Sequence, residues 1–189
     1  MRTSQAGQSA LLLLDAVVVL KKAGVDYAII GAMAASFHGV VRASLGADAV
    51  ISLTTPALKP LEREFANAGF QTELRRGDDG DPISAVLAVK DSYDNRVDLL
   101  VGIRGLDPDA FARAIETTFH AEKLKMISRE DFIAMKLFAG GPQDIQDARR
   151  AVAVSPDTLD RSLLWRLTKR FGRQTLHALR ALGFKEPKP

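Results

Sequence analysis

The chain has 189 residues, which suits one domain or a domain with an appendage and suffices to bury a substantial core. It contains no cysteine, so disulfides, thiolate metal sites and cysteine nucleophiles are excluded. The apolar N-terminal run is interrupted by Asp15 and Lys21, and no window reaches the roughly 18 apolar residues of a membrane span. We therefore expect a cytoplasmic protein without a signal peptide and without a membrane partner.

Positive charge is concentrated near the C-terminus. The net charge is +3, but residues 155–189 hold eight lysines and arginines against three acids, so this segment contributes +5 and the rest of the chain −2. Such a segment predicts either helices with solvated basic faces or a nucleic-acid-binding module that uses the basic C-terminal helices.

The first third of the chain predicts a helix and two strands around a glycine turn. Residues 8–22 have the pattern of an amphipathic helix. Residues 27–30 form a short apolar run that stops at Gly31, which is typical of a buried strand, and the small residues that follow predict a helix packed closely against it. Residues 46–53 predict the second strand. Its carboxylate, Asp48, either caps a turn at the strand edge or meets water, a cation or a metal.

The middle of the chain predicts further strands with helices between them. We expect strands at residues 70–75, 83–89 and 96–101, and a short strand or extended link at 123–127. Thr55 followed by proline predicts a helix start, and Asp107 followed by proline predicts a second helix that runs to about Thr118. The acidic, glycine-rich loop at 76–82 lacks the spacing of a calcium-binding EF-hand and predicts a solvated hairpin turn.

One of these strands carries a carboxylate in an otherwise apolar run. The period of a strand places Arg96, Asp98 and Leu100 on one face. An aspartate inside a strand is disfavoured, so we expect Asp98 to have a specific structural or functional role. It is either the partner of Arg96 or Arg42 in an ion pair, or a functional carboxylate.

Helices dominate the last third of the chain. Ser128 predicts the cap of a helix over 129–139, with Asp131 in a capping-box position. We expect another helix at 143–154, followed by two amphipathic helices separated at Gly172. This gives an expected α/β (α+β) protein with two parts. Residues 1–127 form an α/β domain with a mixed sheet flanked by helices, and residues 128–189 form a small C-terminal helical region.

Lys136 interrupts the apolar face of the first of these helices, and Asp144 and Asp147 share a face of the next one by their spacing. They are either a solvated lysine with two surface acids or parts of a site. His38 is expected to end a helix and to pack on backbone. Trp165, with its basic neighbours, is expected in the core with a basic outer face, although a stacking patch for single-stranded RNA is the alternative.

The stretch from Tyr27 to Leu53 resembles the nucleotidyltransferase superfamily, which includes polymerase-beta-like enzymes, minimal nucleotidyltransferases and AbiEii-type toxins. The family pattern is a strand, Gly followed by Gly or Ser, about ten residues, and Asp-x-Asp opening the next strand. Here Gly31-Ala32 and Gly46-Ala47-Asp48 stand at these elements. Val97-Asp98-Leu99 resembles the setting of the family's third carboxylate. The resemblance extends to about Val154 through a stretch containing Lys136 and Asp147, similar to a bacterial AbiEii-type branch.

The resemblance implies a nucleotidyltransferase-type fold and transfer of a nucleoside monophosphate from a nucleoside triphosphate to an RNA or protein acceptor. It implies Mg²⁺ or Mn²⁺ held by Asp48 and Asp98, two metal ions stabilising the attacking and leaving oxygens. The implied catalytic residues are Asp48, Asp98 and Lys136. The implied nucleotide-binding residues are Gly31, Ala32, Arg42, Ser44, Lys136 and Asp147. A toxin role would add a cognate antitoxin as partner.

Two positions depart from the family pattern: Ala32 replaces the second small residue, and Gly46 replaces the first metal-binding Asp. Loss of such a ligand costs several kcal/mol of transition-state stabilisation, and each 1.4 kcal/mol is about a factor of ten in rate. Three interpretations follow. The chain is an active nucleotidyltransferase, or a catalytically inactive relative that binds a nucleotide or a partner protein, or a nucleic-acid-binding module.

Overall fold

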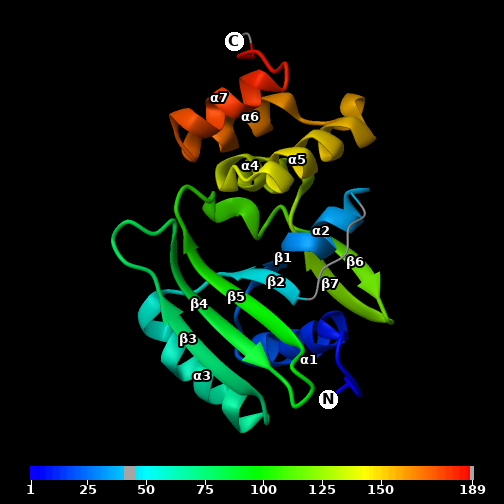
Figure 1. Cartoon of the computed structure of the whole chain (residues 1–189), viewed down its shortest axis with the longest axis vertical. Helices are drawn as coiled ribbons and strands as arrows, with labels where there is room; N and C mark the ends of the chain where they lie inside the picture. The colour runs from blue at the N-terminus through cyan, green and yellow to red at the C-terminus, as the bar shows by residue number, and fades with distance from the viewer. Residues whose placement is uncertain (41–45, 188–189) are drawn as a thin grey trace.

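The computed structural model describes residues 1–40 and 46–187, and its centre is a seven-stranded mixed sheet (Figure 1). The strand order is β3-β4-β5-β2-β1-β7-β6. The strands are β1 (Tyr27–Ile29), β2 (Gly46–Ile51), β3 (Gln71–Arg76), β4 (Ile83–Lys90), β5 (Arg96–Ile103), β6 (Ile115–Phe119) and β7 (Glu122–Met126). Strand β2 runs parallel to β5 and antiparallel to β1, and β1 runs parallel to β7. The mixed sheet confirms the fold class expected from the sequence.

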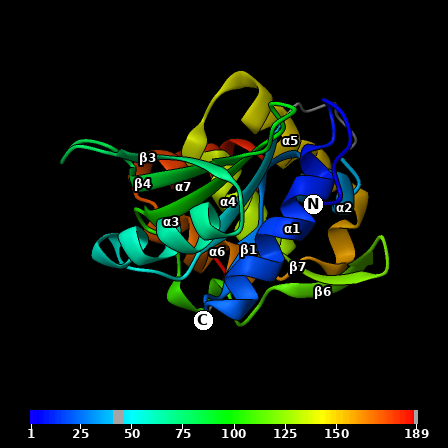
Figure 2. The ribbon, with the colours of Figure 1, turned by 90° about the horizontal axis from the view of Figure 1, so that it is seen from below.

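Helices cover both faces of this sheet. They are α1 (Ser9–Lys22), α2 (Gly31–Phe37), α3 (Leu58–Asn67), α4 (Arg129–Ala139), α5 (Pro142–Val154), α6 (Arg161–Arg170) and α7 (Arg173–Ala181). Seen from below, α1 and α3 lie in front of the sheet and the C-terminal helices lie behind it (Figure 2). None of the described helices is long and apolar enough to cross a membrane.

Strand β2 shows how the alternation of side chains builds two cores. Ala47, Ala49 and Ile51 point toward α1 and α3 and belong to the first apolar cluster. Val50 belongs to the second cluster, which joins α2 and the four C-terminal helices. Since successive side chains point to opposite faces of a strand, Asp48 shares the face of Val50. The sheet therefore presents Asp48 on the side of the C-terminal helices.

The helix expected after Thr55 and Pro56 is confirmed, although residues Thr55–Ala57 first form a 3₁₀ turn and α3 follows at Leu58. The helix expected from Asp107 to about Thr118 is wrong. The Asp107 carboxylate does cap a turn by accepting the Asp109 N–H at 2.9 Å, but that turn is the short 3₁₀ helix Pro108–Ala110. Strand β6 follows it, because residues 115–119 find backbone partners in β7.

The cap expected at Ser128 is confirmed. The Ser128 hydroxyl accepts the Asp131 N–H at 3.1 Å, which satisfies a backbone donor of the first turn of α4. The Asp131 carboxylate in turn accepts two hydrogen bonds from Arg113, at 2.8 and 2.9 Å. The division of the chain between residues 127 and 128 stays a prediction, because the second apolar cluster contains residues from both sides of it.

Candidate functional site

The two carboxylates singled out from the sequence lie side by side on the sheet. Asp48 and Asp98 are register partners in the parallel pair β2–β5. Partners of this kind point to the same face, so their carboxylates share one side of the sheet. Both line a groove of about 380 Å³ on the face not covered by α1 and α3. The structure thus brings together two acids that are fifty residues apart in the chain.

The glycine turn before α2 accommodates one of these acids at very short range. Gly31 has a φ of +63°, a left-handed conformation that glycine adopts without steric cost. A Cβ atom built on Gly31 would overlap the Asp48 Oδ2 atom. The Ile30 N–H also donates to the Asp48 carbonyl at 2.9 Å. Position 31 therefore requires glycine for its backbone conformation and for the room that the carboxylate takes.

Asp98 is already engaged in an ion pair. The Arg96 Nε–H donates to Asp98 Oδ1 at 2.8 Å, and both side chains are partly exposed. This hydrogen bond to Asp98 raises the pKa of the Arg96 guanidinium. The sequence left Arg96 and Arg42 open as partners of Asp98; the structure shows the pair with Arg96, and Arg42 lies outside the described residues. A cation that binds Asp98 must share its carboxylate with Arg96.

Lys136 belongs to a buried ion-pair cluster. Its Nζ lies 2.6 Å from Asp144 Oδ1 and 3.3 Å from Asp147 Oδ2. The Asp147 side chain is fully buried and accepts a hydrogen bond from the Gln143 amide at 2.7 Å. Of the two alternatives drawn from the sequence, a solvated lysine with two surface acids is wrong for Lys136 and Asp147, whereas Asp144 is partly exposed. The two helices α4 and α5 pack together here, which takes the lysine and Asp147 out of solvent.

Lys136 and Asp48 face the same cavity, which has a volume of about 270 Å³. Gly31 and Asp144 also line this cavity, and the rest of its described wall is apolar. Its apolar residues are Ile30, Pro82, Ile83, Leu100, Ile103, Phe132, Met135, Phe138 and Ala139. A mostly apolar cavity with a few convergent polar groups is the usual form of a small-molecule site.

The donor set fits one divalent cation. Within residues 1–40 and 46–187 there is no group of three or more acidic or histidine side chains placed to hold a metal. Two adjacent carboxylates suit Mg²⁺, which proteins bind through one or two carboxylates together with substrate phosphates. Gly46 stands where the family pattern has its first metal-binding Asp. A Cβ atom at this position would fit, because its nearest neighbour would be the Arg96 carbonyl oxygen at 3.8 Å.

Other residues named from the sequence lie away from the carboxylates or outside the described chain. Ser44, like Arg42, lies outside the described residues. Ala32 faces a different cavity, on the other side of α2. His38 ends α2, is buried, and its Nε2 donates to the Ile127 carbonyl at 2.9 Å, as expected for a histidine that packs on backbone. Burial lowers the pKa of His38, although the hydrogen bond to Ile127 opposes this.

The basic C-terminal segment makes many contacts within the chain. Arg166 and Arg170 form ion pairs with the buried Asp107, at 3.0 and 3.9 Å. Arg180 stacks on Trp165, which is buried as expected. Much of this charge therefore holds α6 and α7 against the rest of the molecule. A nucleic-acid-binding role for these helices stays a prediction.

The sequence analysis missed two arginines that line the groove beside the carboxylates. Arg75 and Arg76 end strand β3 and line the same groove as Asp48 and Asp98. The alternation of strand β3 was visible in the sequence. Its position next to β4, at the edge of the sheet, depends on long-range pairing that local patterns do not reveal.

Comparisons with known proteins bear on the fold. No protein-family model and no curated protein sequence matches the chain. Among solved structures, ANT(2″)-Ia in complex with adenylyl-2″-tobramycin is 14% identical and has a TM-score of 0.60 over 85% of this chain and 95% of that one. The solution structure of ANT(2″)-Ia, an antibiotic-resistance factor, gives 14% identity and a TM-score of 0.56, covering 90% and 94% of the two chains.

A putative nucleotidyltransferase from Thermotoga maritima is 15% identical, with a TM-score of 0.54 over 79% of this chain and 96% of that one. At these identities the likeness concerns the fold and not the activity. The chain therefore has a nucleotidyltransferase-like mixed α/β fold, similar to the folds of these proteins.

Proposed function

We propose that the chain binds a nucleoside triphosphate with Mg²⁺ or Mn²⁺ and transfers its nucleoside monophosphate to an acceptor. One observation carries this proposal: Asp48 and Asp98 are register partners on one face of the sheet. Asp48 also borders the cavity that contains Lys136. Asp48 thus connects the acidic pair, which suits a cation, to the cavity of Lys136, which suits a phosphate.

The residues have distinct roles in this proposal. Asp48 and Asp98 would hold the cation, which supplies charge neutralisation on the phosphates when it is bound. Lys136 provides a point charge for a phosphate, and Asp144 and Asp147 keep its side chain in place. The apolar wall of the cavity receives the nucleobase and excludes water, which strengthens the electrostatic interactions of the site.

A second candidate function is nucleotide binding without transfer. Gly46 leaves two carboxylates where the resembling family has three, and Arg96 occupies Asp98 at 2.8 Å. Both features weaken a two-metal centre, which needs ligands for two ions about 4 Å apart. In this case the cavity still binds a nucleotide and the chain acts through a partner protein.

Incubation of the purified protein with Mg²⁺ or Mn²⁺ and each labelled nucleoside triphosphate separates the two candidates. Transfer by the wild type that Asp48→Ala abolishes supports the enzyme. An inert wild type that gains transfer through Gly46→Asp supports the inactive relative. If neither protein transfers label and neither binds a nucleotide, both candidates are wrong.

The class of molecule that accepts the nucleoside monophosphate is a separate part of the proposal. RNA and protein are the two classes that the sequence resemblance implies. The ANT(2″)-Ia structure contains adenylylated tobramycin, so small hydroxyl compounds form a third arm of the assay. A toxin role predicts that expression of the chain arrests growth and that co-expression of a cognate antitoxin restores it. Asp48→Ala should abolish the arrest if transfer causes it.

A further inference from the structure

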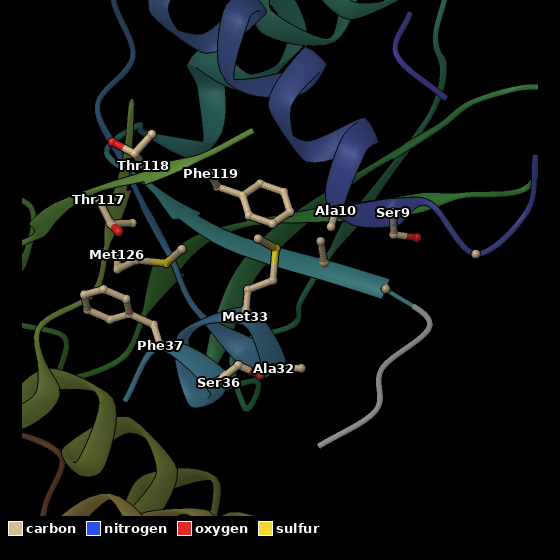
Figure 3. A pocket seen from close by; sticks show the side chains of 13 residues that line it. Ser9, Ala10, Ala32, Met33, Ser36, Phe37, Thr117, Thr118, Phe119 and Met126 are labelled. Atoms are coloured by element: carbon tan, nitrogen blue, oxygen red, sulfur yellow. The ribbon is translucent and has the colours of Figure 1, made fainter. Parts of the chain in front are cut away.

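A second cavity lies on the other side of α2 from the carboxylate site and has a different character. It has a volume of about 420 Å³ and lies between the start of α1, helix α2, the start of β2 and strand β6 (Figure 3). Thirteen described residues line it, and none of them is charged. In a chain whose residues are 26% charged, such a wall is unusual.

The wall is made of thioether, aromatic and small side chains with hydroxyls at its edges. In Figure 3, Met33 and Phe119 point toward one another across the cavity, and Phe37 and Met126 lie together at one side. Thr117, Thr118 and Ser36 add hydroxyl groups at the periphery. Methionines adapt their shape to a ligand, because the thioether chain is flexible and polarisable.

Helix α2 separates this cavity from the carboxylate site. Gly31, the first residue of α2, lines the cavity of Asp48 and Lys136, whereas its neighbour Ala32 lines the uncharged cavity. On β2, Asp48 lines the former and Gly46 the latter. The two positions at which the sequence departs from the family pattern therefore lie on the wall of one cavity. Gly46 contributes backbone to this wall, because position 46 shares the side-chain face of Asp48 and Val50.

We propose that this cavity binds an uncharged, largely apolar small molecule. A charged ligand would lose its hydration here without gaining a counter-charge from the described wall, which disfavours its binding. An apolar ring system gains by leaving water, and the volume lies within the range of small-molecule sites. The proposal does not depend on nucleotidyl transfer, because it requires neither metal nor nucleotide.

The four methionines of the chain allow the site to be located directly. Met33 and Met126 line the uncharged cavity, Met135 lines the cavity of Lys136, and Met1 is exposed. We would titrate methyl-labelled protein with N-phenyl-1-naphthylamine and follow the methionine methyl signals by NMR. The proposal expects the signals of Met33 and Met126 to shift while those of Met1 and Met135 stay. Shifts confined to Met135, or no shifts at all, would overturn it.

A charged analogue and a pair of variants test the ligand class. The same ring system with a sulfonate, 8-anilino-1-naphthalenesulfonate, should bind at least tenfold more weakly. Thr117→Glu, which places a carboxylate at the cavity wall, should weaken binding of the neutral probe at least tenfold, whereas the matched Thr117→Gln should change it less than threefold. Thermal unfolding verifies that both variants fold, and Thr117 is a half-buried residue of β6.

Equal affinity for the two probes, or an unchanged affinity in Thr117→Glu, contradicts an uncharged site. Shifts of Met33 and Met126 that follow protein concentration and not probe concentration would identify a second copy of the chain as the occupant, and would also overturn the proposal. Probe binding can be absent while nucleotidyl transfer is observed, and transfer can be absent while the probe binds. The ligand proposal and the proposed function are therefore tested separately.

Discussion

Two clusters of buried charge differ in what surrounds them. In the first, Arg113 joins Asp131 and Asp107, and none of these three residues lines a described cavity. In the second, Lys136 joins Asp144 and Asp147 at the wall of a 270 Å³ cavity that also contains Asp48. The first cluster uses its charges to join segments of the chain. The second presents its charges to a space that a ligand can enter.

The largest loss of stability should come from the first cluster, in which Arg113 pairs with Asp131 and Asp107. Replacement of Asp131 by Asn leaves Arg113 without its bidentate partner, and breaking a buried pair in this way costs about 3–5 kcal/mol of folding stability. Urea unfolding monitored by circular dichroism measures this loss. If Asp131→Asn loses less than about 1 kcal/mol of folding stability, which is the value of an exposed pair, the Arg113 cluster does not hold the fold together.

An intermediate effect is expected where the glycine turn approaches Asp48. Gly31→Ala combines a left-handed backbone with overlap on the Asp48 carboxylate, so we expect a loss of about 1–3 kcal/mol together with weakened metal binding. Gly24→Ala is the matched control, because Gly24 has a φ of +67° and nothing within 4 Å of an added Cβ. Equal stability of the two variants would show that Asp48 does not restrict position 31.

Folding stability should fall as the pH falls, because the buried His38 binds a proton less readily in the folded chain than in the unfolded chain. Burial lowers the pKa of His38 below 6.5, so below that pH the unfolded chain binds a proton that the folded chain does not. Stability should therefore be level above about pH 7 and fall by at most about 1.4 kcal/mol per pH unit below 6.5, until the folded pKa is passed. Urea unfolding from pH 8 to 5 measures this, and His38→Gln should flatten the decline.

A further loss is expected in stronger acid. Burial alone would raise the pKa of Asp107, but the hydrogen bond from the Asp109 N–H and the neighbouring arginines lower it below 3.8. A carboxylate with a lowered pKa stabilises the fold above its unfolded pKa and loses this contribution as the pH falls through the folded value. The decline below about pH 4 should persist in His38→Gln. Its absence there would contradict the paired state of Asp107.

The smallest effect should come from a pair on the surface. Lys123 and Glu116 lie 3.9 Å apart on strands β7 and β6, and both side chains are mostly exposed. Glu116→Gln should change the free energy of unfolding by no more than about 0.5 kcal/mol. A loss comparable to that of Asp131→Asn would show that burial does not distinguish the ion pairs of this chain.

Local patterns predicted most of the elements but not those that depend on distant partners. The strand at 115–119 was mistaken for a helix, because the Asp-Pro cap signal was genuine but ended after one turn. The β6–β7 hairpin turns at His120 and Ala121, both with positive φ, and such turns usually carry Asn or Gly. The residue types at positions 120 and 121 therefore did not predict a hairpin turn.

The candidate site was predictable to a similar degree. Asp48 and Asp98 were visible because a carboxylate in an apolar strand is uncommon. Their shared face was not visible, because it depends on the register of β2 against β5. The burial of Asp147 was not visible, because it depends on how α5 packs on α4. The uncharged cavity beside Gly46 was hidden for the same reason, since α1, α2 and β6 come together only in the fold.

The most direct test of the central claim is the binding of Mn²⁺ and a non-hydrolysable nucleoside triphosphate analogue, measured together by electron paramagnetic resonance of the free ion. The paired carboxylates predict that the analogue tightens Mn²⁺ binding in the wild type and that Asp48→Asn weakens it at least tenfold, about 1.4 kcal/mol, without loss of the fold. If Asp48→Asn binds Mn²⁺ and the analogue as tightly as the wild type, Asp48 and Asp98 are not a cation site.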